Sequence, residues 1–159
     1  MVEEIELTLN GSTVRLDADG DDALLFVLRN RLGLRAAHFG CGLEQCGACV
    51  VVIEGEARYS CALPVSVVAG KSVATPEALG DDPVGAALLD AFQQQQAGQC
   101  GYCLSGILMS AFALLKKEPR PDRDTIVAAL DRHLCRCGAH GQILAAVEAA
   151  STRLAEQPA

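Results

Sequence analysis

The chain has 159 residues, half of them hydrophobic, so its composition allows a packed core although aromatic residues are scarce. Its 20 acidic and 13 basic residues give a net charge of −7 without any cluster of Lys or Arg, which argues against a nucleic-acid partner. No apolar run approaches the roughly 20 residues that span a bilayer, and the acidic start lacks the basic and apolar regions of a signal peptide, so we expect no direct membrane span and a cytoplasmic location.

The first 75 residues predict several short β-strands. Alternating apolar positions over 5–9 and 14–16 flank Asn10-Gly11, a residue pair that is typical of tight hairpins. Further strands are expected over residues 49–53, 57–63 and 65–68, with a turn at 54–55. These segments predict a small sheet.

One helix interrupts these strands. Residues 23–33 carry Leu side chains at positions that share one helical face. Asp21 or Asp22 is the expected N-cap, and Gly33 is the expected C-cap. Strands around a helix indicate a compact α+β fold.

The apolar pattern changes after residue 69. Residues 69–83 contain several Gly and Pro and predict a linker. Beyond it, apolar residues recur at three- and four-residue spacing, which predicts a bundle of four short helices over 86–95, 104–117, 125–134 and 142–155. We therefore expect two domains, residues 1–75 and residues 84–156.

The N-terminal part contains four cysteines, Cys41, Cys46, Cys49 and Cys61. The gaps of four and two residues between the first three are the spacing of plant-type [2Fe–2S] ferredoxins. A two-iron cluster needs two thiolates at each iron, and a loop can offer three while a distant strand end supplies the fourth. Gly40, Gly42 and Gly47 would let this loop bring backbone N–H groups close to the sulfurs.

The helical part contains two further pairs, Cys100 with Cys103 and Cys135 with Cys137. We expect the first pair to open the helix at 104–117 and the second pair to end the helix at 125–134. Two cysteine pairs on helix ends can converge on one metal centre, and N-terminal helix amides favour anionic thiolates. The sequence thus predicts a second cysteine-bound centre at one end of the bundle.

Other uses of eight cysteines agree less well with the sequence. Four disulfides would suit a secreted chain, but the helices are apolar and no signal peptide is visible. Zinc ribbons use paired C-x2-C knuckles, whereas the first set has a four-residue gap and the second has Cys-x-Cys. Neither pair follows the strand–helix–strand pattern of a thioredoxin-like redox site. Because both quartets are complete without them, His38, His133 and His140 are expected to pack beside the sites and not to bind metal as in a Rieske centre.

The cysteine motifs, taken in this order, resemble those of the small iron–sulfur subunits of the molybdenum hydroxylases, the xanthine oxidase family. The resemblance spans nearly the whole chain through Gly40-Cys41-Gly42 to Cys49-Val50-Val51, Ser60-Cys61-Ala62-Leu63-Pro64, Gln99-Cys100-Gly101-Tyr102-Cys103 and Leu134-Cys135-Arg136-Cys137. It implies a β-grasp ferredoxin domain, a four-helix [2Fe–2S] domain and two [2Fe–2S] clusters. It also implies a large partner subunit that holds molybdopterin, with Cys137 and Gln99 facing the pterin.

Two departures from the usual family motifs narrow this resemblance. Gly138-Ala139-His140 stands where Thr-Gly-Tyr is common, and Leu104-Ser105-Gly106 stands where Thr-Pro-Gly is common. These variants resemble the small subunits of nicotinate, isoquinoline and aldehyde dehydrogenases. The implied function is the relay of single electrons from the molybdenum centre to a cytochrome c or flavin acceptor, with an N-heterocycle or aldehyde as substrate and no catalytic residue in this chain. A free-standing ferredoxin-like carrier is the alternative that stays open.

Overall fold

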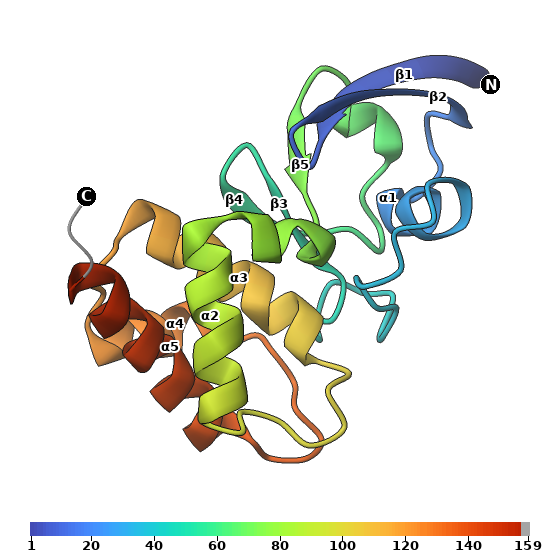
Figure 1. Cartoon of the computed structure of the whole chain (residues 1–159). Coiled ribbons are helices and arrows are strands. Elements are labelled where there is room, and N and C mark those ends of the chain that lie inside the picture. The colour runs from blue at the N-terminus through green and yellow to red at the C-terminus, as the bar shows by residue number, and fades with distance from the viewer. Residues whose placement is uncertain (157–159) are drawn as a thin grey trace.

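The computed structural model describes residues 1–156 and contains one five-stranded sheet and a group of four longer helices (Figure 1). In spatial order the strands are β2 (Ser12–Asp19), β1 (Val2–Leu9), β5 (Ser72–Ala74), β3 (Val50–Ile53) and β4 (Glu56–Tyr59). β1 and β5 run parallel, and all other neighbours run antiparallel. A helical segment packs on this sheet, so the expected α+β fold with a β-grasp unit is confirmed.

The β1–β2 hairpin follows the predicted alternation. The apolar residues of β1 at positions 5, 7 and 9 are buried, and Leu9 pairs with Ser12 across the turn. Asn10 and Gly11 both have positive φ, 50° and 82°. This pair of left-handed residues gives a turn whose twist matches that of the two strands.

The helix predicted over 23–33 is divided into α1 (Leu24–Phe26) and a π-helical segment, η1 (Val27–Arg31). Its apolar face is buried as expected, and Gly33 has a φ of 71° directly after the C-cap residue. The predicted N-cap is wrong, because Ala23 occupies that position. The Asp22 carboxylate instead accepts a hydrogen bond from Arg31, 2.8 Å away.

Two predictions between residues 65 and 83 are also wrong. Residues 65–68 form a 3-10 turn, η2 (Val65–Val68), because two valines three residues apart face the core. The predicted linker over 69–83 contains β5 and a second 3-10 segment, η3 (Pro76–Asp81). β5 lies in the middle of the sheet, yet only one of its three residues is buried, so no alternation reveals it in the sequence.

The four predicted helices are α2 (Pro83–Gln94), α3 (Leu104–Lys117), α4 (Arg123–Leu130) and α5 (His140–Glu156). Figure 1 shows them grouped together, away from β1 and β2. The Asp82 and Asp122 carboxylates cap α2 and α4 by accepting backbone N–H groups. The prediction that α4 reaches residue 134 is wrong, because the Leu134 N–H donates to the Cys46 carbonyl and so leaves the helical pattern.

Two hydrophobic cores meet at β3. Val51 and Ile53 pack into the core between the sheet and α1, whereas Val50 and Val52 pack among the helices. A strand buried on both faces has a continuous apolar sequence, which is why residues 49–53 predict it well. Because β3 packs in both cores, the two cores do not by themselves divide the chain into separate domains. The domain boundaries at residues 1–75 and 84–156 therefore stay a prediction. Among the described residues, no helix is both long and apolar enough to cross a membrane.

Candidate metal centres

The first cysteine quartet is assembled from a loop and two strand ends. Cys41 and Cys46 lie in the glycine-rich loop, Cys49 directly precedes β3, and Cys61 follows β4. The thiols lie in two neighbouring pairs, Cys41 with Cys46 and Cys49 with Cys61. The buried Ser60 hydroxyl donates to the Cys49 carbonyl at 2.6 Å and joins the two strand ends.

Backbone amides surround the exposed pair of this quartet. The N–H groups of Leu43 and Gln45 donate to the Cys41 Sγ at 3.3 Å, and the Cys41 N–H donates to the Cys46 Sγ at 3.4 Å. The amides of Gln45 and Leu43 lower the pKa of Cys41 to about 7. Burial instead raises the pKa of Cys49 to about 11. A bound metal ion would keep this buried thiol deprotonated at neutral pH.

The second quartet lies on two loops of the helical part. Cys103 is the N-cap residue of α3, as predicted for the first pair. Cys135 and Cys137 were expected to end α4 but lie in the loop between α4 and α5, because α4 stops at Leu130. This pair is therefore next to the N-terminus of α5, where the helix dipole favours a negative charge.

The thiols of the second quartet pair across the two loops. Cys100 contacts Cys137, and Cys103 contacts Cys135. Burial and the Cys135 thiol raise the pKa of Cys103 to about 12. Burial also acts to raise the pKa of Cys135, but hydrogen bonds, led by the Ala139 N–H at 3.5 Å, lower it overall. Each quartet thus combines a thiol whose pKa is lowered with a thiol whose pKa is raised.

Gln99 lies at the accessible edge of the second quartet. Its Nε2 donates to the Cys137 carbonyl at 3.4 Å. The Gln99 side chain is exposed and Cys137 is half-buried, so a partner molecule can reach both. That they face a pterin stays a prediction.

A small cavity separates the two quartets. It measures about 180 Å³ and is lined by cysteines of both sets, namely Cys41, Cys46, Cys100 and Cys103. Tyr102 lines it as well and bridges the loops, because its hydroxyl donates to the Phe39 carbonyl at 2.5 Å and its ring stacks on His38 with centroids 4.4 Å apart. The sequence pattern did not predict this bridge. The position of Tyr102 inside the Cys-x2-Cys motif indicated only that its ring lies near the second quartet.

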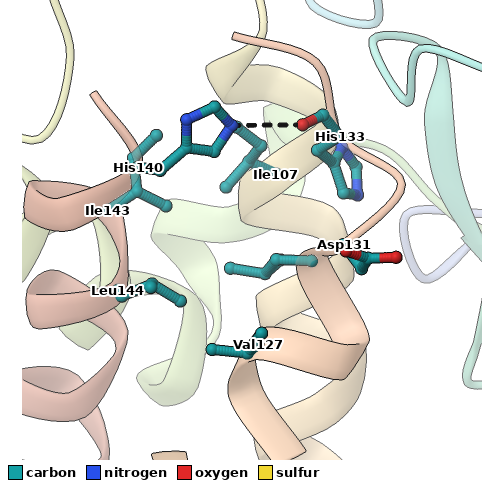
Figure 2. Close-up of a pocket in the computed structure, with 8 residues that line it drawn as sticks. Ile107, Val127, Asp131, His133, His140, Ile143 and Leu144 are labelled. Carbon is teal, nitrogen blue, oxygen red and sulfur yellow. Dashed lines mark hydrogen bonds between the residues drawn. The ribbon is translucent and has the colours of Figure 1, made fainter. Parts of the chain in front are cut away.

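The histidines near the quartets contact protein groups. His133 is buried and shares a 2.7 Å hydrogen bond with the Ser110 hydroxyl, and burial lowers its pKa to about 4. The His140 imidazole lies 3.4 Å from the His133 carbonyl, across the loop that joins α4 and α5 (Figure 2). Both residues border an apolar cavity of about 240 Å³ that no cysteine lines.

The donor chemistry fits two-iron clusters. Each quartet offers its thiols as two pairs, and a [2Fe–2S] cluster takes two thiolates at each of two irons. All eight thiols are free of disulfides. The residues present therefore suit a cluster in each quartet.

Known proteins share both halves of this arrangement. A family model described as a 2Fe-2S iron-sulfur cluster binding domain matches residues 7–79, and one described as a [2Fe-2S] binding domain matches residues 75–148. The chain is 45% identical to a nicotinate dehydrogenase subunit of Pseudomonas putida, over 96% of this chain and 98% of that protein. It is 50% identical to the alpha subunit of isoquinoline 1-oxidoreductase of Brevundimonas diminuta, over 95% and 99% of the two chains. The crystal structure of quinoline 2-oxidoreductase from Pseudomonas putida 86 contains a similar chain, with a TM-score of 0.89 and 31% identity over 98% of this chain and 99% of that one.

Proposed function

The chain belongs to the small iron–sulfur subunits of the molybdenum hydroxylases, the xanthine oxidase family, and we propose that it relays single electrons through two [2Fe–2S] clusters held by its eight cysteines. It serves as the electron-transfer subunit of an oxidoreductase. The molybdopterin cofactor and the substrate are bound by a larger partner subunit, which leaves this chain without a catalytic residue of its own.

The observation that carries this proposal is the meeting of the two quartets at one cavity. Cys41 and Cys46 of the first quartet line this cavity, and Cys100 and Cys103 of the second quartet line it as well. Two redox groups held at these positions are neighbours within one chain. A free-standing ferredoxin needs only one such group, whereas two in series suit a subunit that receives electrons at one surface and passes them on at another.

The protein's own part in this relay is to bind, to insulate and to supply hydrogen bonds. When bound, a [2Fe–2S] cluster takes up or gives one electron at a time, at a potential that depends on hydrogen bonds to the sulfurs and on solvent exposure. The Leu43 and Gln45 amides donate such bonds at Cys41, and the Ala139 amide donates one at Cys135. The burial of Cys49 and Cys61 keeps water from their side of the first quartet.

We propose that the second quartet faces the molybdenum-bearing subunit. Gln99 and Cys137 form an accessible edge there and would meet the pterin. Electrons would then leave from the first quartet for a cytochrome c or flavin acceptor.

The substrate of the assembled enzyme is proposed to be an N-heteroaromatic compound. Support comes from the similar proteins, which are named for nicotinate, isoquinoline and quinoline. An aldehyde is the second candidate, since an aldehyde oxidoreductase iron–sulfur subunit of Escherichia coli is 33% identical over 92% of the chain. We place the complex in the cytoplasm, where thiols stay reduced until clusters are built.

The metal content of the purified protein tests the cluster assignment. Two [2Fe–2S] clusters require about four iron and about four acid-labile sulfide per chain. Cys46→Ser and Cys103→Ser should each remove one of two EPR signals and leave the other, so that each variant controls for misfolding in its counterpart. Stoichiometric zinc without iron would contradict the proposal.

The order of the relay is tested separately with Cys137→Ser. In the complex isolated with its partner, this variant should block reduction of the first cluster by substrate while dithionite still reduces that cluster. Full turnover in the variant would count against the relay order. Isolation of the chain without any molybdenum-containing subunit would favour the free-standing carrier.

A further inference from the structure

The residues before Cys135 lie on the loop of the other quartet. The Leu134 N–H donates to the Cys46 carbonyl at 3.0 Å. His133 is buried so closely against Gly47 that a Cβ on this glycine would lie 2.1 Å from the imidazole Nδ1. The segment 132–134 thus belongs to the second quartet in sequence and contacts the first quartet in space.

Arg132 extends this contact with a positive charge. Its Nη2 donates to the Glu44 carbonyl at 3.1 Å, within the loop that carries Cys41 and Cys46. Its guanidinium carbon lies 5.1 Å from the centroid of the Tyr59 ring, two residues before Cys61. The guanidinium therefore touches both chain segments that build the first quartet.

We propose that Arg132 raises the redox potential of the cluster held by the first quartet, by placing a fixed positive charge beside it. The inference rests on the proposed function, in which that quartet holds a [2Fe–2S] cluster. Reduction of such a cluster adds one negative charge, and a nearby cation favours the more negative state. A guanidinium stays protonated throughout the working pH range, so its effect is constant. The helical part of the chain would in this way tune the ferredoxin-type site.

A charge series at residue 132 tests the proposal in the holoprotein as it is purified with its partner. The variants are Arg132→Lys, Arg132→Gln and Arg132→Glu, and the measurement is an EPR-monitored redox titration of both cluster signals. The matched control is Arg58→Gln, which removes the same charge from the residue beside Tyr59 on β4. Arg58 lines a cavity with Ile53 and Leu63, on the other face of the strand from Tyr59.

Arg132→Gln is expected to lower the ratio of reduced to oxidised first cluster at a fixed ambient potential by about three- to tenfold, the effect of one partly screened charge. The upper value corresponds to about 59 mV for one electron. Arg132→Glu should give about twice the shift of Arg132→Gln, Arg132→Lys should stay near the parent protein, and Arg58→Gln should change the ratio less than about twofold.

Several outcomes would overturn the inference while leaving the proposed function intact. One is an unchanged potential of the first cluster in Arg132→Gln with both EPR signals present. Another is an equal shift of this potential in the Lys, Gln and Glu variants, which would indicate an effect of loop geometry and not of charge. If Arg132→Gln loses the cluster, Arg132→Lys is compared with the parent protein instead. An unchanged potential of the first cluster in Arg132→Lys then supports the charge effect, and a shifted potential contradicts it. Absence of iron–sulfur signals from the parent protein would instead refute the proposed function.

Discussion

Replacement of Gly106 by Ala tests the contact between α3 and the first cysteine loop. Gly106 lies in the first turn of α3, where an added Cβ would be 1.8 Å from the Gly47 carbonyl oxygen and 3.2 Å from the Ala48 carbonyl carbon. Non-bonded heavy atoms need well over 3 Å, so helix and loop would have to separate by roughly 1 Å or more. Both obstacles are backbone atoms and cannot rotate away.

The expected loss of stability follows from two opposing terms. Overpacking of a well-packed site costs about 1–3 kcal/mol, and the backbone obstacle places Gly106→Ala near about 3 kcal/mol. Helix propensity favours Ala over Gly by about 1 kcal/mol. The net loss is therefore about 2 kcal/mol, which for a chain of 159 residues lowers the Tm by about 4–8 °C.

Thermal melting of the cluster-loaded protein measures this loss, with far-UV circular dichroism and visible absorbance recorded at one scan rate. The matched control is Gly141→Ala in α5, where nothing lies within 4 Å of the added Cβ. This control should melt at or slightly above the parent Tm. If Gly106→Ala melts within about 1 °C of the parent, the packing argument is refuted.

Gly47→Ala should destabilise the chain and reduce its iron content, because residue 47 has a φ of 81° and its Cβ would collide with His133. Gly55→Ala has the same unfavourable φ, 80°, without any atom within 4 Å of the Cβ, so it should cost only about 1 kcal/mol and keep its iron. Equal iron loss in both variants would refute the collision. Although burial acts to raise the pKa of Asp82, the 2.9 Å ion pair with Lys116 and a backbone N–H lower it overall. A carboxylate whose pKa is lower in the folded chain than its usual value of about 4 stabilises the fold above that usual value. This stabilisation is lost as the pH falls from there through the lowered pKa of the folded chain. Asp82→Asn should thus cost less than about 1 kcal/mol at pH 7, and its Tm should converge with the parent Tm as the pH falls below about 4. A difference in Tm that stays constant with pH would contradict the role of the charge.

The cysteine spacings were sufficient to predict the candidate ligands, since ligand type and loop length are properties of a short stretch of chain. The β1–β2 hairpin, β3 and α3 were predictable for the same reason. Alternation of side chains, a left-handed turn pair and a three- to four-residue repeat all operate within about 15 neighbouring residues. The division into two domains at residues 75 and 84 and the assignment of the eight ligands stay predictions.

Other features depend on contacts between distant segments. β5 is a strand because β1 and β3 on either side supply its partners, although its own three residues carry almost no pattern. α4 ends early because an amide of the α4–α5 loop bonds to the Cys46 carbonyl, and this early end leaves the last cysteine pair in the loop before α5. The same contact brings Arg132 beside the first quartet. Local propensity can predict which residues are able to bind iron, but hydrogen bonds between segments 88 residues apart determine which charges surround them.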